Sequence, residues 1–306
     1  MAVTAFVLAG GLAAWIVTVE RMQGMDAGPG TDLGGLGFYL GIWVTMMAAM
    51  MLPAAAPMVL LFARVSGDRA ERGRPGVVPT WVFVAGYLAV WTAYGLVAYG
   101  LFRAVEGADG GVLAWDRAGP YVAGAAVAAA GLYELTPLKD VCLRHCRSPL
   151  HFVLHGWKEG YRGALRMGAE HGAYCVGCCW GLMVVLFALG VMSLFWMGIV
   201  AALVSVQKVL PLGQRLVTRV FSVAFVALGI WITAAPGSVP GLTQPNSEAA
   251  ERARMRMMHM RPSPSMGKTK PSISTGEEKG MSPTMSDQSQ PSTGMTDDNS
   301  SMEESP

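Results

Sequence analysis

Residues 174–206, YCVGCCWGLMVVLFALGVMSLFWMGIVAALVSV, form a run of 33 residues without a charged side chain. As one α-helix this run would be about 50 Å long, whereas a hydrocarbon core of about 30 Å is crossed by roughly 20 residues. The run is therefore too long for one ordinary membrane span. We expect it to form two short helices that meet near Ser193.

The composition of the whole chain is that of a polytopic membrane protein. Its 306 residues are 52% hydrophobic and only 14% charged, whereas a soluble domain carries about 25% charged residues. The five cysteines all lie between Cys142 and Cys179, and this odd, crowded set argues against an extracellular disulfide framework. The net charge of +2 says little about partners, and we expect no nucleic acid among them.

Five further apolar segments complete a predicted all-α transmembrane bundle of about seven spans. They run from about Val3 to Val19, Leu36 to Phe62, Val78 to Phe102, Ala118 to Leu135 and Val217 to Ala234. If residues 174–206 formed one tilted helix, the bundle would have six spans. The first segment has neither a basic leader nor a small-residue cleavage site, so we interpret it as a span rather than a signal peptide.

The placement of lysine and arginine predicts the orientation of the bundle. Three alternate loops are basic: Arg64, Arg69, Arg72 and Arg74 follow the second span, Lys139, Arg144, Arg147, Lys158, Arg162 and Arg166 follow the fourth, and Lys208 and Arg215 follow the sixth. The opposite loops hold only Arg21, Arg103 and Arg117. Because cytoplasmic loops carry the excess of basic residues, the N-terminus is expected in the cytoplasm and the C-terminal tail outside. One helix over 174–206 would reverse the side of the tail.

The composition changes after residue 235, which divides the chain into a transmembrane domain, 1–235, and a tail, 236–306. The tail is rich in Met, Ser and Pro and has no apolar periodicity, so it cannot bury enough surface to fold and is expected to be disordered. Its segment MRMMHM, residues 255–260, offers thioether and imidazole side chains. This segment either collects copper outside the membrane or is ordinary low-complexity sequence.

The segment HGAYCVGCCWGLM, residues 171–183, groups one histidine with three cysteines. In a helix, His171, Cys175, Cys178 and Cys179 share an arc of about 100°. Thiolate and imidazole ligands suit Cu(I) and Zn(II). One straight helix cannot surround an ion, so further ligands must come from another segment or from an unwound start of the fifth span, where a helix N-terminus would favour the thiolate.

The segment CLRHC, residues 142–146, supplies such ligands. Cys142, His145 and Cys146 have the spacing i, i+3, i+4 and would share one helix face. They follow the fourth span, on the same predicted cytoplasmic side as the start of the fifth. We therefore predict that the two segments form one metal site at the cytoplasmic face, where the reducing environment keeps thiols free to act as ligands.

Two other interpretations of the cysteines stay open. Cys175 and Cys178 have the Cys-x-x-Cys spacing of dithiol oxidoreductases, although no thioredoxin-like βαβ pattern surrounds them and Cys179 adds a third thiol. Alternatively, the cysteines are small apolar residues that only pack, in a structural subunit of a membrane complex. Two glycine pairs, Gly168 with Gly172 and Gly177 with Gly181, have the spacing that lets transmembrane helices approach closely.

Methionines in the second span favour copper over zinc. Met46, Met47, Met50 and Met51 form two i, i+4 rows there, and thioethers bind Cu(I), although methionine also fills apolar cores.

No motif in the chain defines an enzymatic reaction. It has no phosphate-binding glycine loop, no HExxH and no GxSxG. Acids that would indicate a proton-driven transporter are scarce; Glu134 and Gln207 lie at the edges of the fourth and sixth spans. A role without catalysis is favoured, and enzymatic activity is left open.

Four segments resemble a bacterial family of predicted metal-binding integral membrane proteins, a domain of unknown function. They are MMAAMMLPAAAPM (46–58), LTPLKDVCLRHCRSP (135–149), HGAYCVGCCWGLM (171–183) and GVMSLFWM (190–197), within a family-like core of about 36–235. The resemblance implies a multispanning protein with a metal site and no defined reaction. Its motif residues fall on Cys142, Cys146, His171, Cys175, Cys178 and Cys179.

These observations predict a multi-pass protein of the bacterial inner membrane that binds a transition metal, Cu(I) rather than Zn(II), for metal handling or delivery. Its expected partners are the lipid bilayer and a metallochaperone or other membrane subunits.

Overall fold

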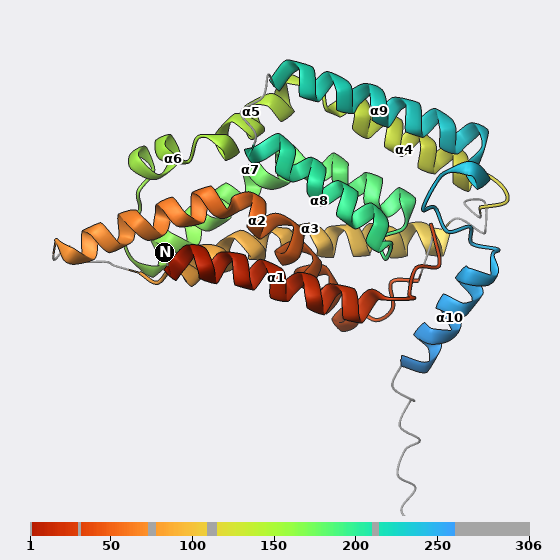
Figure 1. Ribbon diagram of the computed structural model, residues 1–306, viewed down its shortest axis with the longest axis horizontal. Coiled ribbons are helices and arrows are strands. Elements are labelled where there is room, and N and C mark those ends of the chain that lie inside the picture. The colour runs from red at the N-terminus through yellow and green to blue at the C-terminus, as the bar shows by residue number, and fades with distance from the viewer. Residues whose placement is uncertain (1, 30–31, 73–77, 109–114, 210–213, 261–306) are drawn as a thin grey trace, which may run out of the picture. The chain divides into compact units, whose positions relative to one another are not determined.

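The protein is all-helical throughout the part of the chain that the computed structural model describes, residues 2–29, 32–72, 78–108, 115–209 and 214–260 (Figure 1). No β-strand occurs in these ranges. The apolar segments expected to be spans all form helices, which confirms the predicted fold class. The helices up to residue 234 are α1 (Ala2–Met22), α2 (Leu36–Glu71), α3 (Thr80–Ala108), α4 (Gly119–Tyr133), α5 (Pro137–Arg147), α6 (Pro149–His155), α7 (Gly160–Leu189), α8 (Leu194–Val209) and α9 (Gln214–Ala234).

Several of these helices have the length and apolarity needed to cross a membrane. By these criteria alone, α2, α3, α7 and residues Leu216–Ala234 of α9 qualify. Helix α8 is apolar but shorter. The structure thus contains four spanning-length helices among the described residues.

The long apolar run breaks where the sequence predicts. Helix α7 ends at Leu189, and α8 begins at Leu194. Gly190 between them has φ +111°, a conformation that only glycine adopts without strain, and its carbonyl accepts a hydrogen bond from Ser193 N at 3.0 Å. Helices α7 and α8 therefore form a hairpin and pack against each other (Figure 1).

Helix α7 begins much earlier than the sequence pattern indicated. The ligand stripe was expected near the start of a helix, but α7 starts at Gly160, so Cys175 lies about 22 Å from its N-terminus. The charged residues between 160 and 170 lower the hydropathy of the first half of α7, so the apolar pattern did not indicate a helix there. At this distance the N-terminal dipole, which acts within the first turn, cannot favour a thiolate at Cys175.

Close backbone contacts join α3 to α7. A Cβ atom added to Gly168 would lie 2.0 Å from the carbonyl oxygen of Phe83, and one added to Gly86 would lie 2.1 Å from that of Leu165. Gly172 also lies against the backbone of α3. Gly168 and Gly172 thus allow the close helix approach that their spacing predicted.

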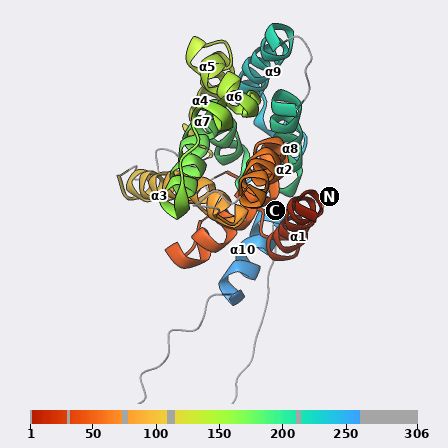
Figure 2. The ribbon, with the colours of Figure 1, turned by 90° about the vertical axis from the view of Figure 1, so that its left-hand side faces the viewer.

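The remaining helices pack around this pair. Helices α4 and α9 lie side by side and α4 contacts α7, while α2 contacts α1, α3 and α8 (Figures 1 and 2). Aromatic side chains join α2 to α3: Trp43 Nε1 donates to the Trp91 carbonyl at 2.9 Å, and the Tyr39 hydroxyl donates to that of Gly95 at 3.1 Å. Buried polar groups of these rings are thus satisfied by backbone acceptors.

The start of the expected disordered tail contains regular structure. A 3₁₀ turn covers Pro236–Ser238, and helix α10 covers Glu248–Met260. Ser247 caps α10 through its hydroxyl, which accepts from Ala250 N at 3.3 Å, and Ala250 and Ala253 are buried with Ala27. The capping hydrogen bond and the burial of two alanines stabilise α10 despite the polar composition of the segment. The rest of the expected tail, 261–306, lies outside the described residues.

Candidate thiol metal site

Four cysteine thiols from two helices come together in the core. Cys146 of α5 faces Cys178 of α7 with 3.8 Å between their sulfur atoms, and Cys178 lies 3.3 Å from Cys179. The Cys175 thiol interacts with the other three. We call these four residues the thiol cluster. A sulfur separation of about 3.8 Å is the edge of a tetrahedron with metal–sulfur bonds of about 2.3 Å.

The three cluster cysteines of α7 are buried more deeply than Cys146 of α5. Cys175, Cys178 and Cys179 are at most 1% exposed, whereas Cys146 is half-buried. All five cysteines of the chain are free thiols. Cys146 is therefore the least buried member of the thiol cluster.

Two residues that the sequence did not connect with the cysteines contact Cys175. Lys208 Nζ donates to its sulfur at 2.8 Å, and the Tyr87 hydroxyl lies 2.9 Å from the same atom. Lys208 was counted among loop residues, but it lies in the last turn of α8 and is only 9% exposed. The only sequence signal was its place at the end of a long apolar run, since local composition cannot reveal a contact between positions 175 and 208.

His171 lies beside the cluster in a ring-lined pocket. Its imidazole stacks on Tyr87 with 5.7 Å between ring centroids and also contacts Phe83 and Phe152. The side chain is buried, and its Nδ1 has no hydrogen-bond partner among the described residues. An unpartnered buried nitrogen next to thiols is a donor that an ion could satisfy.

The structure does not bring two of the predicted ligands into the cluster. The Cys142 sulfur packs against Gly177, where an added Cβ would be 2.7 Å away. His145 is exposed, stacks on Tyr174 at 4.3 Å between centroids, and has its Nδ1 2.9 Å from the Val141 carbonyl. Of CLRHC, only Cys146 faces the sulfur atoms of α7.

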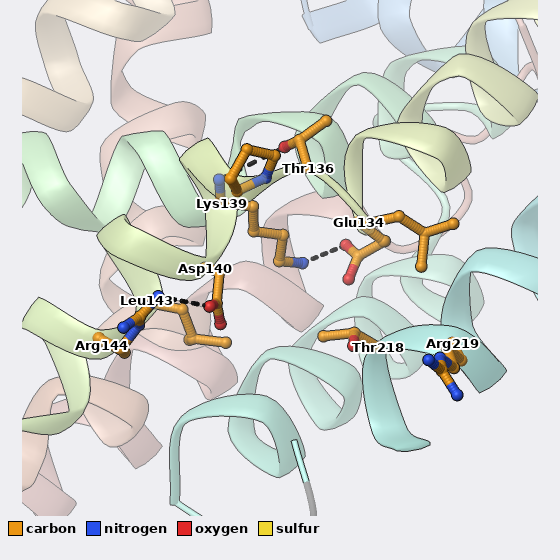
Figure 3. Close-up of a pocket in the computed structure, with 10 residues that line it drawn as sticks. Glu134, Thr136, Lys139, Asp140, Leu143, Arg144, Thr218 and Arg219 are labelled. Carbon is orange, nitrogen blue, oxygen red and sulfur yellow. Dashed lines mark hydrogen bonds and ion pairs between the residues drawn. The ribbon is translucent and has the colours of Figure 1, made fainter. Parts of the chain in front are cut away.

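A buried ionic network holds α5 in place. Lys139 donates to the Glu134 carboxylate (Figure 3). It also donates to the Gln207 side-chain oxygen at 2.9 Å, and the Gln207 amide donates to Glu134 at 2.9 Å. Glu134, Lys139 and Gln207 are each at most 4% exposed. Thr136 caps α5, because its hydroxyl accepts from Lys139 N at 3.4 Å. The network fixes the start of the helix that carries Cys146.

A cavity of about 660 Å³ opens beside this network (Figure 3). Its described lining includes Glu134, Lys139, Arg144 and Arg219 and contains no cysteine. Asp140 in its wall pairs with Arg144 at 2.7 Å. The cavity is therefore a charged recess next to α5 and is separate from the thiol cluster.

The thiols of α5 favour their neutral form. The interaction with Cys175 and, to a smaller extent, burial raise the pKa of the Cys146 thiol well above its ordinary value, against opposing effects of Cys178 and Lys208. Burial also raises the pKa of Cys142. A soft metal ion that binds Cys146 must displace its proton.

The methionine rows of α2 are part of the same core. Met46, Met47, Met50 and Met51 are at most 1% exposed and belong to one packed cluster with Cys175, Cys178 and Cys179. Helix α2 buries both rows because it packs against α1, α3 and α8. Whether these thioethers bind an ion stays a prediction, since core packing alone accounts for their burial.

The sulfur atoms are gathered but not arranged as a finished coordination shell. In the part of the chain that the structure describes, no group of three or more Cys, His, Asp or Glu side chains has the geometry to hold an ion. The close approach of Cys178 and Cys179, at 3.3 Å, is tighter than two sulfurs on one ion require. Loading an ion therefore requires the sulfur atoms to move.

These features define a helical protein with spanning-length helices and a buried group of soft-metal donors. A family model described as PpoB2, copper chaperone, matches residues 40–232, and the chain belongs to this family. The matched range contains the thiol cluster, His171 and Lys208. Neither a curated protein nor a solved structure matches the chain.

Proposed function

We propose that this protein is a copper chaperone of the bacterial inner membrane that binds Cu(I) through the thiol cluster and transfers it to a partner. One observation carries the proposal: thiols of two separate helices meet in a buried core, with Cys146 and Cys178 3.8 Å apart. Thiolates select soft ions such as Cu(I). The copper-chaperone description of the family supports the same cargo.

In this proposal three of the four cluster thiols act in sequence. Cys146, half-buried on a short helix, first accepts the ion from a donor protein. Cys178, opposite it, and Cys175 then take the ion into the core, since exchange between neighbouring thiolates never leaves the ion without ligands. His171 supplies a neutral nitrogen donor beside Cys175. Release to another membrane subunit reverses these steps.

The membrane placement belongs to the proposal. Four spanning-length helices support it, and the basic loops favour a cytoplasmic N-terminus. The half-buried Cys146 would then lie on the cytoplasmic side, where reduced Cu(I) is exchanged between thiols.

The test is copper binding by the purified full-length protein in detergent, under reducing and oxygen-free conditions. With a chelator that competes for Cu(I), the parent protein should hold about one Cu(I) per chain, and the variant Cys175→Ser/Cys178→Ser should hold none. Cys142→Ser is the matched control, because Cys142 is a half-buried cysteine of α5 outside the cluster, and it should bind like the parent.

Other outcomes would favour other functions. A parent protein without stoichiometric copper contradicts the proposal. If Cys175 and Cys178 instead become resistant to alkylation after oxidation and recover on reduction, with no metal bound, the protein is a membrane thiol–disulfide oxidoreductase. Binding that survives loss of both cysteines would place the copper elsewhere, for example on methionines.

A further inference from the structure

Lys208 is a buried cation that faces sulfur instead of a carboxylate. Its ammonium donates to Cys175 Sγ at 2.8 Å, and the thiols of Cys178 and Cys179 are close enough to interact with its charge. The neighbouring carboxylate of Glu134 is already paired with Lys139. Within the described residues, Cys175 is thus the group in hydrogen-bond contact with Lys208 that can carry a compensating negative charge.

Because Lys208 and the cluster are buried, the summed charge of the bound ion, its thiolate ligands and Lys208 affects the free energy of binding. An ammonium taken out of water costs several kcal/mol unless a negative group compensates it. Cu(I) held by two thiolates has a net charge of −1, and the ammonium of Lys208 brings the group to zero. Zn(II) held by two thiolates and neutral donors is already uncharged and gains nothing from Lys208. In a low-dielectric core the neutral combination is favoured.

We propose that Lys208 is the charge-balancing residue of the thiol cluster and makes the cluster select a monovalent soft cation held by two thiolates. This inference rests on the proposed function and deepens it. Lys208 is a positioning residue and not a ligand, because a charged ammonium has three N–H donors and no lone pair. A metal-bound Cys175 sulfur keeps lone pairs with which to accept the N–H of Lys208.

The test compares affinities for monovalent and divalent ions in the full-length protein. The variants are Lys208→Met, which removes the charge, and Lys208→Arg, which keeps it. Lys158→Met is the matched control, because Lys158 pairs with Glu170 outside the cluster. The probes are Cu(I), Ag(I) as a second monovalent soft ion, and Zn(II), each titrated against a competing chelator.

We expect Lys208→Met to lower the affinity for Cu(I) and Ag(I) about a hundredfold, as loss of one member of a buried charge pair does. The affinity for Zn(II) should change by no more than about threefold, because the zinc form needs no counter-charge. The affinities of Lys208→Arg for all three ions should stay within about tenfold of those of the parent protein. Lys158→Met should bind all of them unchanged.

Three results would overturn the inference. Equal losses for Cu(I) and Zn(II) would mean that Lys208 only supports the fold, tighter Cu(I) binding would mean that the ammonium competes for Cys175, and no change would mean that its charge is irrelevant. If the parent protein binds Cu(I) but the variants match it, only the role of Lys208 fails; if the parent binds none, the proposed function fails. Should Lys208→Met not give helical, monodisperse protein, Lys208→Gln provides the same uncharged comparison.

Discussion

At the scale of single residues, the core combines sulfur with polar groups that lack ordinary partners. Lys208 faces Cys175, and the Nδ1 atom of His171 has no partner among the described residues. The unpartnered nitrogen of His171 lowers the stability of the metal-free protein and suits a core that is completed by an ion. The residue types Cys and His could be recognised as ligands from the sequence. The pairing of Cys175 with Lys208 could not, because it joins two helices across a turn.

Replacing His171 by Phe should leave the metal-free protein as stable as the parent or about 1 kcal/mol more stable, since it removes an unsatisfied buried nitrogen from an aromatic pocket. Thermal unfolding in detergent, followed by circular dichroism, measures this change. His145→Phe, at an exposed ring, is the comparison and should shift the midpoint little. A clear drop in the midpoint for His171→Phe would show that its nitrogen has a partner in the metal-free protein.

At the scale of elements, close packing of α3 on α7 sets the position of the cysteines. Gly168 lies about two helical turns before Cys175 and allows the backbones of α3 and α7 to come into contact. Gly168→Ala should therefore lower the free energy of unfolding by about 2 kcal/mol or more, because the added Cβ would overlap the Phe83 carbonyl. Denaturant titration in detergent measures the loss.

The control for this prediction is Gly41→Ala, where an added Cβ meets nothing within 4 Å. Alanine is the better helix former, so this variant should be neutral or slightly stabilised. Equal effects of the two substitutions would contradict close packing at Gly168.

The ionic network at α5 gives a second prediction for an element. Lys139→Met leaves the Glu134 carboxylate buried without its cation, and we expect a loss of about 3–5 kcal/mol. Lys139→Met/Glu134→Gln, which removes both charges, should recover most of it. Cu(I) affinity should fall and recover in parallel, because the network holds the helix that carries Cys146. A double variant as unstable as the single one would argue against an unpaired charge as the cause.

Element positions were predictable to different degrees for physical reasons. Hydropathy is a local sum, so it located the apolar helices and the break near Ser193. Hydropathy did not locate the first half of α7, although Ala164, Met167 and His171 repeat there at helical spacing and are buried. Lys139 was also assigned to a loop, because local hydropathy does not register the ion pair with Glu134 and the hydrogen bond to the distant Gln207 that permit its burial.

At the scale of the whole molecule, the described core is sufficient for the proposed copper site. All four cluster cysteines lie in the compact unit Met1–Arg261. A protein ending at residue 261 should therefore keep both the copper stoichiometry and the thermal midpoint of the full chain. Copper analysis and thermal unfolding of the two purified proteins provide the check. Loss of bound copper would mean that methionines beyond residue 261 contribute to the cluster's affinity.

The two arms of the α7–α8 hairpin are equally long between the turn and the pair Cys175 and Lys208. Leu189 follows Cys175 by fourteen positions, and Lys208 follows Leu194 by fourteen positions. Each arm therefore carries its residue about 21 Å back from the turn at Gly190. Deleting one residue from a single arm would shift its partner by about 1.5 Å and turn it by about 100°. A deletion in either arm should therefore separate Lys208 from Cys175, and a second deletion in the other arm would restore the length of the hairpin but not the direction in which the turn points.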